Sequence, residues 1–242
     1  MIRSSKESIP RILKENIYMQ GNIYRDKIYP LQDRILKVLE ELNLDFYLTG
    51  GTALSRCYLQ HRYSDDLDLF VNNHSAFKDQ CKTIINACKS KWHVDITTTS
   101  DSFLRFFIEA GDVSVKIDLV NDVPFHYGKI ETCSLFHRVD NWRNILSNKI
   151  CALSRLELKD LVDIIYISQR YLFEWEEIVR EAKEKDLWVD PLEICRTVSA
   201  FPIELLSDIK WIEDMKNLEI KEKVNVLHDD IFRGNSNSLF VG

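Results

Sequence analysis

Three aspartates in two short segments of this chain suggest a site for divalent cations. Asp66 and Asp68 stand two residues apart in a run that alternates polar and apolar side chains, and Asp118 follows about fifty residues later in a similar run. Successive side chains of a strand point to opposite faces, so Asp66 and Asp68 share the face that the intervening leucines leave free. Carboxylates are preferred ligands of Mg²⁺, and a pair of such ions can bridge the attacking and leaving oxygens of a transferred phosphate group. We therefore expect all three aspartates to hold Mg²⁺ or Mn²⁺ if the two strands are neighbours.

Two glycines precede these carboxylates and suggest a phosphate site beside them. Gly50 and Gly51 follow a short apolar run and lead into a helix expected over residues 52–60, for which Thr52 is a suitable N-cap. Glycine lets a ligand approach the backbone closely, and a helix start offers unpaired N–H groups and a positive dipole end to anions. With the hydroxyls of Thr52 and Ser55 added, we expect these four residues to hold the phosphates of a nucleoside triphosphate.

Each of these features also has a purely structural interpretation. A Gly-Gly pair usually makes only a turn, and an Asp-x-Asp strand often presents a solvated face. Arg62, near the end of the short helix, either compensates the helix dipole or contacts a phosphate. The order of the parts favours function, because strand, Gly-Gly, helix, Asp-x-Asp strand and later Asp strand rarely occur together by chance.

A second group of charged residues lies in the later helical part of the chain. Lys149 interrupts the apolar stripe of a helix expected over residues 142–156. Its ammonium either snorkels to solvent, or reaches a triphosphate or a carboxylate near the metal site. Asp163 lies in a segment that is apolar almost all round, so it needs a partner, for which Lys149, Arg155 and Lys159 are candidates.

The hydrophobic periodicity predicts an α+β protein in which a mixed sheet is followed by helices. The expected strands are residues 46–49, 66–71, 103–110 and 113–120, the last two forming a hairpin that turns at Gly111 and Asp112. The expected helices are residues 31–42, 75–89, 142–156, 158–171, 175–185, 191–200 and a tail from about 209, besides a helical arm within residues 1–25. We expect an α/β domain over residues 1–130 and a helical domain over 131–242.

Composition sets limits on location and partners. The chain has 242 residues and a formal net charge of −6, so only a local basic patch could bind nucleic acid. Its six cysteines form no CxxC pair, which predicts free, mostly buried thiols in a reducing compartment. The polar first residues do not resemble a signal peptide, and no apolar run approaches the roughly 18 residues of a membrane span. We expect a cytoplasmic protein with no membrane partner.

The segment GGTALSRCYLQHRYSDDLDLF resembles the first motif of the AbiEii/AbiGii-type nucleotidyltransferase toxins, within the polymerase-β-like nucleotidyltransferase superfamily. VSVKIDLV resembles their third carboxylate strand, and NKICALSRLELKDLVDIIYI resembles their later helical motifs, so the resemblance covers roughly residues 45 to 170. One departure is Gly-Thr where many relatives have Gly-Ser, which keeps the hydroxyl. The resemblance implies a polymerase-β-like fold, an NTP substrate, a functional lysine at Lys149 and a functional aspartate at either Asp160 or Asp163.

What this resemblance implies for activity is transfer of a nucleoside monophosphate from an NTP to an acceptor hydroxyl. The acceptor expected from relatives is RNA, such as a tRNA 3′ end, and the biological role is that of a toxin with a cognate antitoxin protein. A protein or small-molecule hydroxyl is the alternative acceptor, which the acidic pI of about 5.6 favours. A third hypothesis is a catalytically silent binding module on the same fold, against which the presence of all three carboxylates argues.

Overall fold

One mixed five-stranded sheet organises the first half of the chain. The computed structural model describes residues 21–212 and 217–241, so the helical arm expected over residues 1–25 lies mostly outside the described residues. The strands are β1 (Tyr47–Thr49), β2 (Leu67–Asn72), β3 (His93–Thr99), β4 (Phe103–Ala110) and β5 (Val113–Asp122). Their order in the sheet is β1-β2-β5-β4-β3, with β2 and β5 parallel and the other neighbours antiparallel. The predicted α+β class is confirmed.

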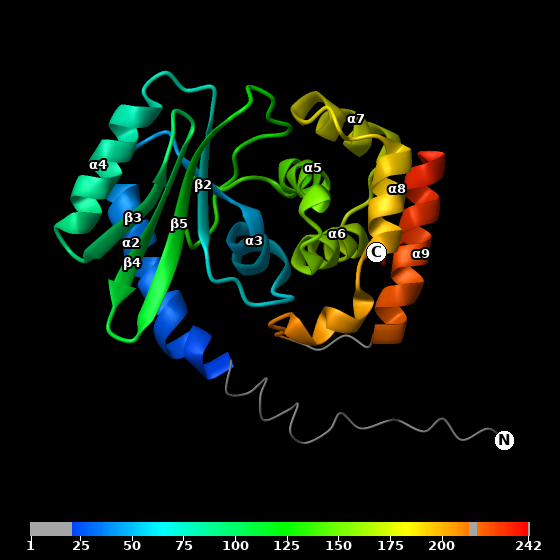
Figure 1. Cartoon of the computed structure of the whole chain (residues 1–242), viewed down its shortest axis with the longest axis horizontal. Helices are drawn as coiled ribbons and strands as arrows, with labels where there is room; N and C mark the ends of the chain where they lie inside the picture. Colours follow the sequence, from blue (N-terminus) through cyan, green and yellow to red (C-terminus); the bar gives the residue numbers. More distant parts are fainter. Residues whose placement is uncertain (1–20, 213–216, 242) are drawn as a thin grey trace.

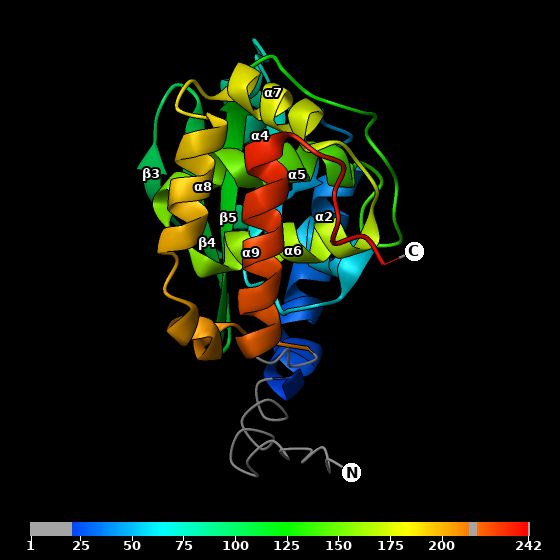
Figure 2. The ribbon, with the colours of Figure 1, turned by 90° about the vertical axis from the view of Figure 1, so that its right-hand side faces the viewer.

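Helices cover both faces of this sheet. Before β5 they are η1 (Tyr24–Ile28), α2 (Tyr29–Glu41), α3 (Gly50–Ala53), η2 (Leu54–Leu59) and α4 (Phe77–Lys89). After β5 they are α5 (Trp142–Ala152), η3 (Leu153–Arg155), α6 (Leu158–Arg170), α7 (Trp175–Lys185), α8 (Pro191–Ala200), η4 (Ile203–Asp208) and α9 (Asn217–Arg233). Helices α2 and α4 lie on one side of the sheet and α3, α5 and α6 on the other (Figure 1). Beyond α5 and α6, the antiparallel pair α8 and α9 closes the far side of the molecule (Figure 2).

The alternation of β2 and β5 places apolar and charged residues on opposite faces, as predicted. Leu67, Leu69, Ile117 and Leu119 are fully buried in the core under α2 and α4. The other face, which carries the aspartates, looks toward α5 and α6. One cluster of buried apolar side chains continues from the sheet into the C-terminal helices, and the division into two domains near residue 130 stays a prediction. In the described part of the chain, no helix is long and apolar enough to cross a membrane.

The short helix after β1 starts earlier than the sequence indicated. It begins at Gly50, with Thr49 at the N-cap, and continues as η2 to Leu59. Gly50 has φ +68°, a conformation that glycine adopts without strain. Thr52 therefore lies inside the helix, and the prediction that it caps the N-terminus is wrong.

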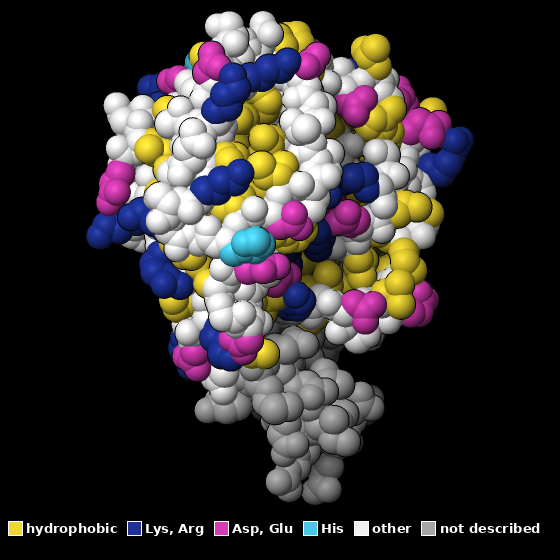
Figure 3. All heavy atoms as spheres, turned by 60° about the vertical axis from the view of Figure 1, so that its left-hand side comes forward, with side chains coloured by type: hydrophobic (Ala, Val, Ile, Leu, Met, Phe, Trp, Pro, Cys, Tyr) yellow, Lys and Arg dark blue, Asp and Glu magenta, His cyan; other side chains and the backbone are white. Residues whose placement is uncertain are grey.

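Two further differences separate the structure from the prediction. Strand β3 was not expected; six of its seven residues are exposed, and its alternation of polar and apolar residues is short because it ends in three threonines. It forms one wall of a groove of about 700 Å³ against α4, in which apolar side chains gather (Figure 3). Cys57 and Cys133 are joined by a disulfide, so the expectation of free thiols is wrong for this pair, whereas the remaining four cysteines are free.

Candidate functional site

The sheet brings the three predicted aspartates together on one face. Asp68 and Asp118 are direct neighbours on the parallel strands β2 and β5, and Asp66 immediately precedes β2. Thr49 of β1 pairs with Asp68, which places Gly50 so close that an added Cβ would lie 2.3 Å from Oδ2 of Asp68. Only glycine fits at this position, because any side chain would displace the carboxylate.

Partial burial and neighbouring negative charge perturb the carboxylate of Asp68. Burial and the neighbouring negative charges of Asp66 and Asp118 raise the pKa of Asp68 to about 6. The side-chain carboxylate of Asp68 makes no hydrogen bond or ion pair with another described residue. A partly buried carboxylate of this kind is stabilised by a nearby positive charge, such as a bound cation would supply.

The other two carboxylates contact cations of the sheet itself. Arg105 on β4 binds Asp118 through Nε–Oδ1 at 2.7 Å and Nη2–Oδ2 at 2.8 Å. Lys116 Nζ lies 2.8 Å from Oδ2 of Asp66 and 3.8 Å from Oδ2 of Asp118. Within residues 21–212 and 217–241, no group of three or more Asp, Glu, His or Cys side chains is arranged so that it could hold a metal ion. Sequence reasoning did not assign a role to Arg105 or Lys116.

The hydroxyls expected at the phosphate site face the protein instead. Thr52 donates its Oγ1 hydrogen to the carbonyl of Asp66, and Ser55 donates to the carbonyl of Arg62. Both side chains are buried, and neither lines the two cavities that adjoin the aspartates. They fix the segment that leads into β2, and so position its carboxylates. Gly51 faces the guanidinium of Arg62, which a Cβ there would approach to 2.6 Å.

A buried ionic network surrounds Asp163 on α6. One oxygen accepts a hydrogen bond from Nε of Arg62 at 2.7 Å and lies 2.8 Å from Nε2 of His61. The other oxygen accepts a hydrogen bond from Nη2 of Arg62 at 2.7 Å and lies 2.7 Å from Nζ of Lys149. Asp160 binds the same ammonium at 2.6 Å, so both helical aspartates that were left as alternatives contact Lys149. Of the three cations named as candidate partners of Asp163, only Lys149 contacts it.

Electrostatics explains why these buried charges are stable. Burial would raise the pKa of Asp163, but Arg62 and Lys149 hold it well below its usual value. Burial would lower the pKa of Lys149, but Asp163 and Asp160 raise it. Burial lowers the pKa of His61, and its Nδ1 has no partner among the described residues, so the ring is neutral with the proton on Nε2. Arg155, the second partner of Asp160, contacts it at 3.0 Å from a largely exposed position.

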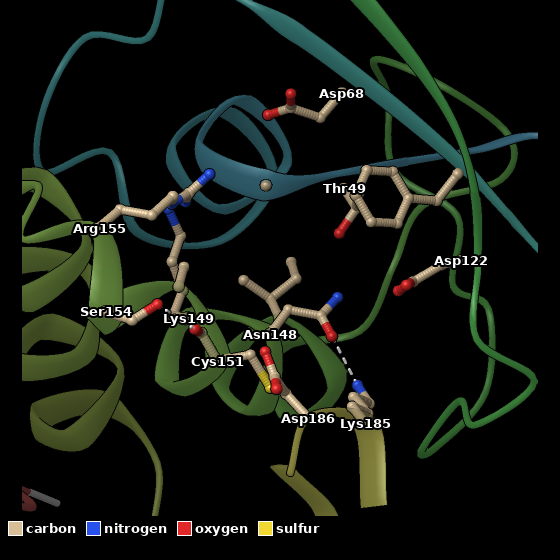
Figure 4. A pocket seen from close by; sticks show the side chains of 14 residues that line it. Thr49, Asp68, Asp122, Asn148, Lys149, Cys151, Ser154, Arg155, Lys185 and Asp186 are labelled. Atoms are coloured by element: carbon tan, nitrogen blue, oxygen red, sulfur yellow. Dashed lines mark hydrogen bonds between the residues drawn. The ribbon is translucent and has the colours of Figure 1, made fainter. Parts of the chain in front are cut away.

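A cavity of about 410 Å³ opens between the carboxylate face of the sheet and the ends of α5 and α7. This volume lies within the range of small-molecule sites. Figure 4 shows Asp68 on one wall and Lys149 and Arg155 on another, with the polar pair Asn148 and Lys185 at the far end. Lys185 Nζ donates to Oδ1 of Asn148 at 2.6 Å.

A second, smaller cavity of about 150 Å³ adjoins the first. Its lining includes Asp66 and Asp118 together with the cations Arg105, Lys116 and Lys159. The two cavities share a boundary, because three residues line both: Asp68, Lys149 and Arg155. The predicted carboxylates and the predicted lysine therefore meet where the two cavities join.

A further buried aspartate was not anticipated. Asp140 lies in the loop before α5 and is fully buried. Its carboxylate accepts from Thr49 Oγ1 at 2.6 Å and Asn144 Nδ2 at 2.9 Å, and it contacts His126 Nε2 at 3.0 Å. It ties the N-terminus of α5 to the end of β1, which fixes one wall of the larger cavity relative to the glycines.

Comparisons with known proteins agree with this geometry. The family model for the nucleotidyl transferase AbiEii toxin of type IV toxin–antitoxin systems matches residues 34–227. A search of curated proteins gives no significant match. A solved structure from H. pylori, described as a candidate nucleotidyltransferase, is similar at a TM-score of 0.57 and 17% identity, covering 86% of this chain and 96% of that one. The Helicobacter pylori protein JHP933 is similar at a TM-score of 0.52 and 19% identity, covering 93% of this chain and 94% of that one. At these identities the two structures show the fold alone.

Proposed function

Because this chain belongs to the AbiEii family of nucleotidyl transferase toxins of type IV toxin–antitoxin systems, we propose that it transfers a nucleoside monophosphate from an NTP to RNA. Divalent cations bound at Asp66, Asp68 and Asp118 are part of this proposal. Membership makes the chain a nucleotidyltransferase, and the toxin family implies an NTP substrate and an antitoxin partner. The metal, the RNA acceptor and the roles of individual residues are parts of the proposal. The observation that carries it is the pairing of Asp68 with Asp118 on neighbouring strands beside Gly50.

The carboxylates present fit a divalent cation. They supply only oxygen donors, which Mg²⁺ and Mn²⁺ prefer. Asp68 is the best evidence for the fit, because it is partly buried, has no described counter-ion in contact, and has room beside it only because residue 50 is glycine. Divalent cations bound there would neutralise charge on the phosphate oxygens during transfer.

The triphosphate is expected in the larger cavity, along Gly50 and toward Lys149 and Arg155. The backbone at Gly50 can approach phosphate oxygens closely, and Lys149 reaches this cavity while Asp160 and Asp163 hold its ammonium in place. The polar end of the cavity, at Asn148 and Lys185, then receives the nucleoside. We do not assign direct phosphate contacts to Thr52, Ser55 or Arg62, whose polar groups are bound elsewhere in the protein.

The acceptor is expected in the smaller cavity, on the Asp118 side. Its hydroxyl oxygen attacks the α-phosphorus, and the bond from that phosphorus to the leaving pyrophosphate breaks. The hydroxyl proton passes to the carboxylate of Asp118, one of several acidic groups that line this cavity. Arg105, Lys116 and Lys159 line this cavity, and with divalent cations holding the carboxylates they would supply the local positive charge that an otherwise acidic chain needs to bind an RNA backbone.

A labelled-substrate screen tests this proposal. The protein is incubated with Mg²⁺, each α-labelled NTP in turn, and total RNA, protein extract or small metabolites as acceptors. Asp68→Asn removes the central carboxylate charge, and Asp101→Asn, at an exposed position that lines neither of the two cavities of the site, is the matched control. We expect label on RNA with the wild type and the control, and none with Asp68→Asn. Label on protein or a metabolite would exclude RNA as the acceptor, and no transfer at all, or equal transfer by Asp68→Asn, would overturn the proposal.

A further inference from the structure

Two cations of the sheet occupy carboxylates that the proposed function assigns to metal ions. Arg105 binds both oxygens of Asp118, at 2.7 and 2.8 Å, and Lys116 lies 2.8 Å from Asp66. Asp68, the third carboxylate, has no such contact with a described residue. The contacts therefore cover two of the three proposed ligands and leave uncovered the one that lies against Gly50.

Strand register makes these contacts a built-in property of the sheet. Arg105 on β4 stands directly opposite Asp118 on β5. In the parallel pair of β2 and β5, Leu67 stands opposite Ile117, so the preceding residues Asp66 and Lys116 are neighbours as well. Cross-strand neighbours of opposite charge attract each other across about 5 Å between Cβ atoms, which both side chains span easily. The pairing needs no special loop conformation.

A guanidinium and a metal ion that bind the same carboxylate repel each other. Arg105 uses one lone pair on each oxygen of Asp118, so a cation coordinating that carboxylate would stand next to the guanidinium, and the repulsion between the two positive charges favours departure of the guanidinium. Both cationic side chains can move, because Arg105 is 37% exposed and Lys116 24% exposed. This distinguishes them from Lys149, which is 9% exposed between two fully buried aspartates.

We propose that Arg105 and Lys116 are counter-ions of the metal site, which hold Asp118 and Asp66 in place until divalent cations displace them. This inference rests on the proposed function. The two are positioning residues, since they act on the reaction through the carboxylates. Without metal they offset two of the three negative charges on the sheet face, which keeps the carboxylates from repelling one another. Once displaced, they remain beside the smaller cavity, where an anionic substrate enters.

Metal affinity of matched variants tests the proposal without any assay of activity. Free Mn²⁺ is measured by electron paramagnetic resonance during titration of the wild type, Arg105→Gln and Lys159→Gln. Lys159 lines the same cavity but pairs with Glu157, so its replacement removes an equal charge without touching the carboxylates. We expect Arg105→Gln to bind Mn²⁺ about three- to ten-fold more tightly, the range for a charge-assisted pair with one partner partly exposed. Lys159→Gln is expected to change affinity by less than about two-fold.

A second measurement follows the metal titration in the wild-type protein itself, and a variant serves only to assign one resonance. The Nε–H resonance of Arg105, assigned by its loss in Arg105→Lys, is followed during titration with Mg²⁺. We expect it to move as the contact with Asp118 is broken, and to reach its final position at the Mg²⁺ concentration that saturates binding. An unmoved resonance at saturation would show that the pair persists with metal bound, and would overturn the inference.

The outcomes separate this inference from the proposed function. If Mn²⁺ binds the wild type and is lost in Asp68→Asn, but Arg105→Gln binds no more tightly than Lys159→Gln, only the counter-ion role fails. If Mn²⁺ does not bind the wild type, or binds Asp68→Asn equally well, both fail.

Discussion

Replacing Asp163 with asparagine would remove the carboxylate on which three buried groups converge. His61, Arg62 and Lys149 all contact it, at 2.7 to 2.8 Å, and the aspartate itself is fully enclosed. Asparagine keeps nearly the same shape, so the cavity-forming part of the change is small. What changes is the charge, because the amide offers a single oxygen acceptor and its NH₂ group would face donors.

The expected cost follows from the enclosure of the partners. The side chain of Arg62 is 6% exposed and that of Lys149 is 9% exposed, so neither charge recovers full hydration when its partner is lost. Breaking a buried pair by removing one member typically costs about 3–5 kcal/mol. Lys149 keeps Asp160, which places the estimate near the lower end, at about 3 kcal/mol. A domain of ordinary stability has only about 5–15 kcal/mol in total, so the loss would be easily measured.

Urea unfolding at neutral pH, followed by tryptophan fluorescence, is the assay. We expect Asp163→Asn to lower the midpoint without changing the denaturant slope, which indicates a loss of stability in an unchanged fold. Glu193→Gln is the control, because Glu193 pairs with Arg196 on the exposed face of α8 and should contribute less than about 0.5 kcal/mol. A loss below about 1 kcal/mol for Asp163→Asn would refute the view that this network holds Lys149 in place.

Three further predictions concern other positions. Gly50→Ala introduces a Cβ against Asp68 and forces a strained φ, so we expect at least about a hundred-fold loss of nucleotidyl transfer, measured against wild type at equal folded concentration. His61→Gln should flatten the pH dependence of stability. Burial lowers the pKa of His61 in the folded protein, so below about pH 6.5 the unfolded chain binds one more proton than the folded chain does. The free energy of unfolding then falls by at most about 1.4 kcal/mol for each pH unit of acidification. Thermal melts at about pH 7.5 and 5.5 would show a smaller difference in melting temperature for the variant than for the wild type. Asp140→Asn should cost about 1.5–3 kcal/mol in urea unfolding, because charge-assisted contacts anchoring α5 become neutral, and an unchanged midpoint would contradict that anchoring role.

Local periodicity was sufficient to predict the strands that carry the site. Strands β2 and β5 are each buried on one face and polar on the other, so their alternation identified the aspartate face directly. The hairpin of β4 and β5 was also predicted, and its turn at Gly111 sets a register in which Arg105 faces Asp118. The contact between Arg105 and Asp118 could therefore be predicted from the hairpin register, although the sequence analysis assigns no role to Arg105.

Other features depend on tertiary contacts that periodicity does not encode. Strand β3 lies at the sheet edge with both faces largely exposed, so nothing in its sequence required alternation. The helix start at Gly50 is fixed by the packing of Asp68 against it, and capping preferences alone favoured Thr52. His61 and Arg62 meet Asp163 across about a hundred residues, and no local pattern links a loop to a distant buried helix.

The central claim is that Asp66, Asp68 and Asp118 bind divalent cations beside the glycine-initiated helix. Crystals grown with Mn²⁺ and an NTP analogue that cannot release pyrophosphate would test it by anomalous diffraction. The account predicts a manganese peak in contact with Asp68 and at least one of the other two carboxylates, with the triphosphate lying along Gly50. A manganese peak elsewhere, or a bound triphosphate that leaves these carboxylates paired only with Arg105 and Lys116, would contradict it.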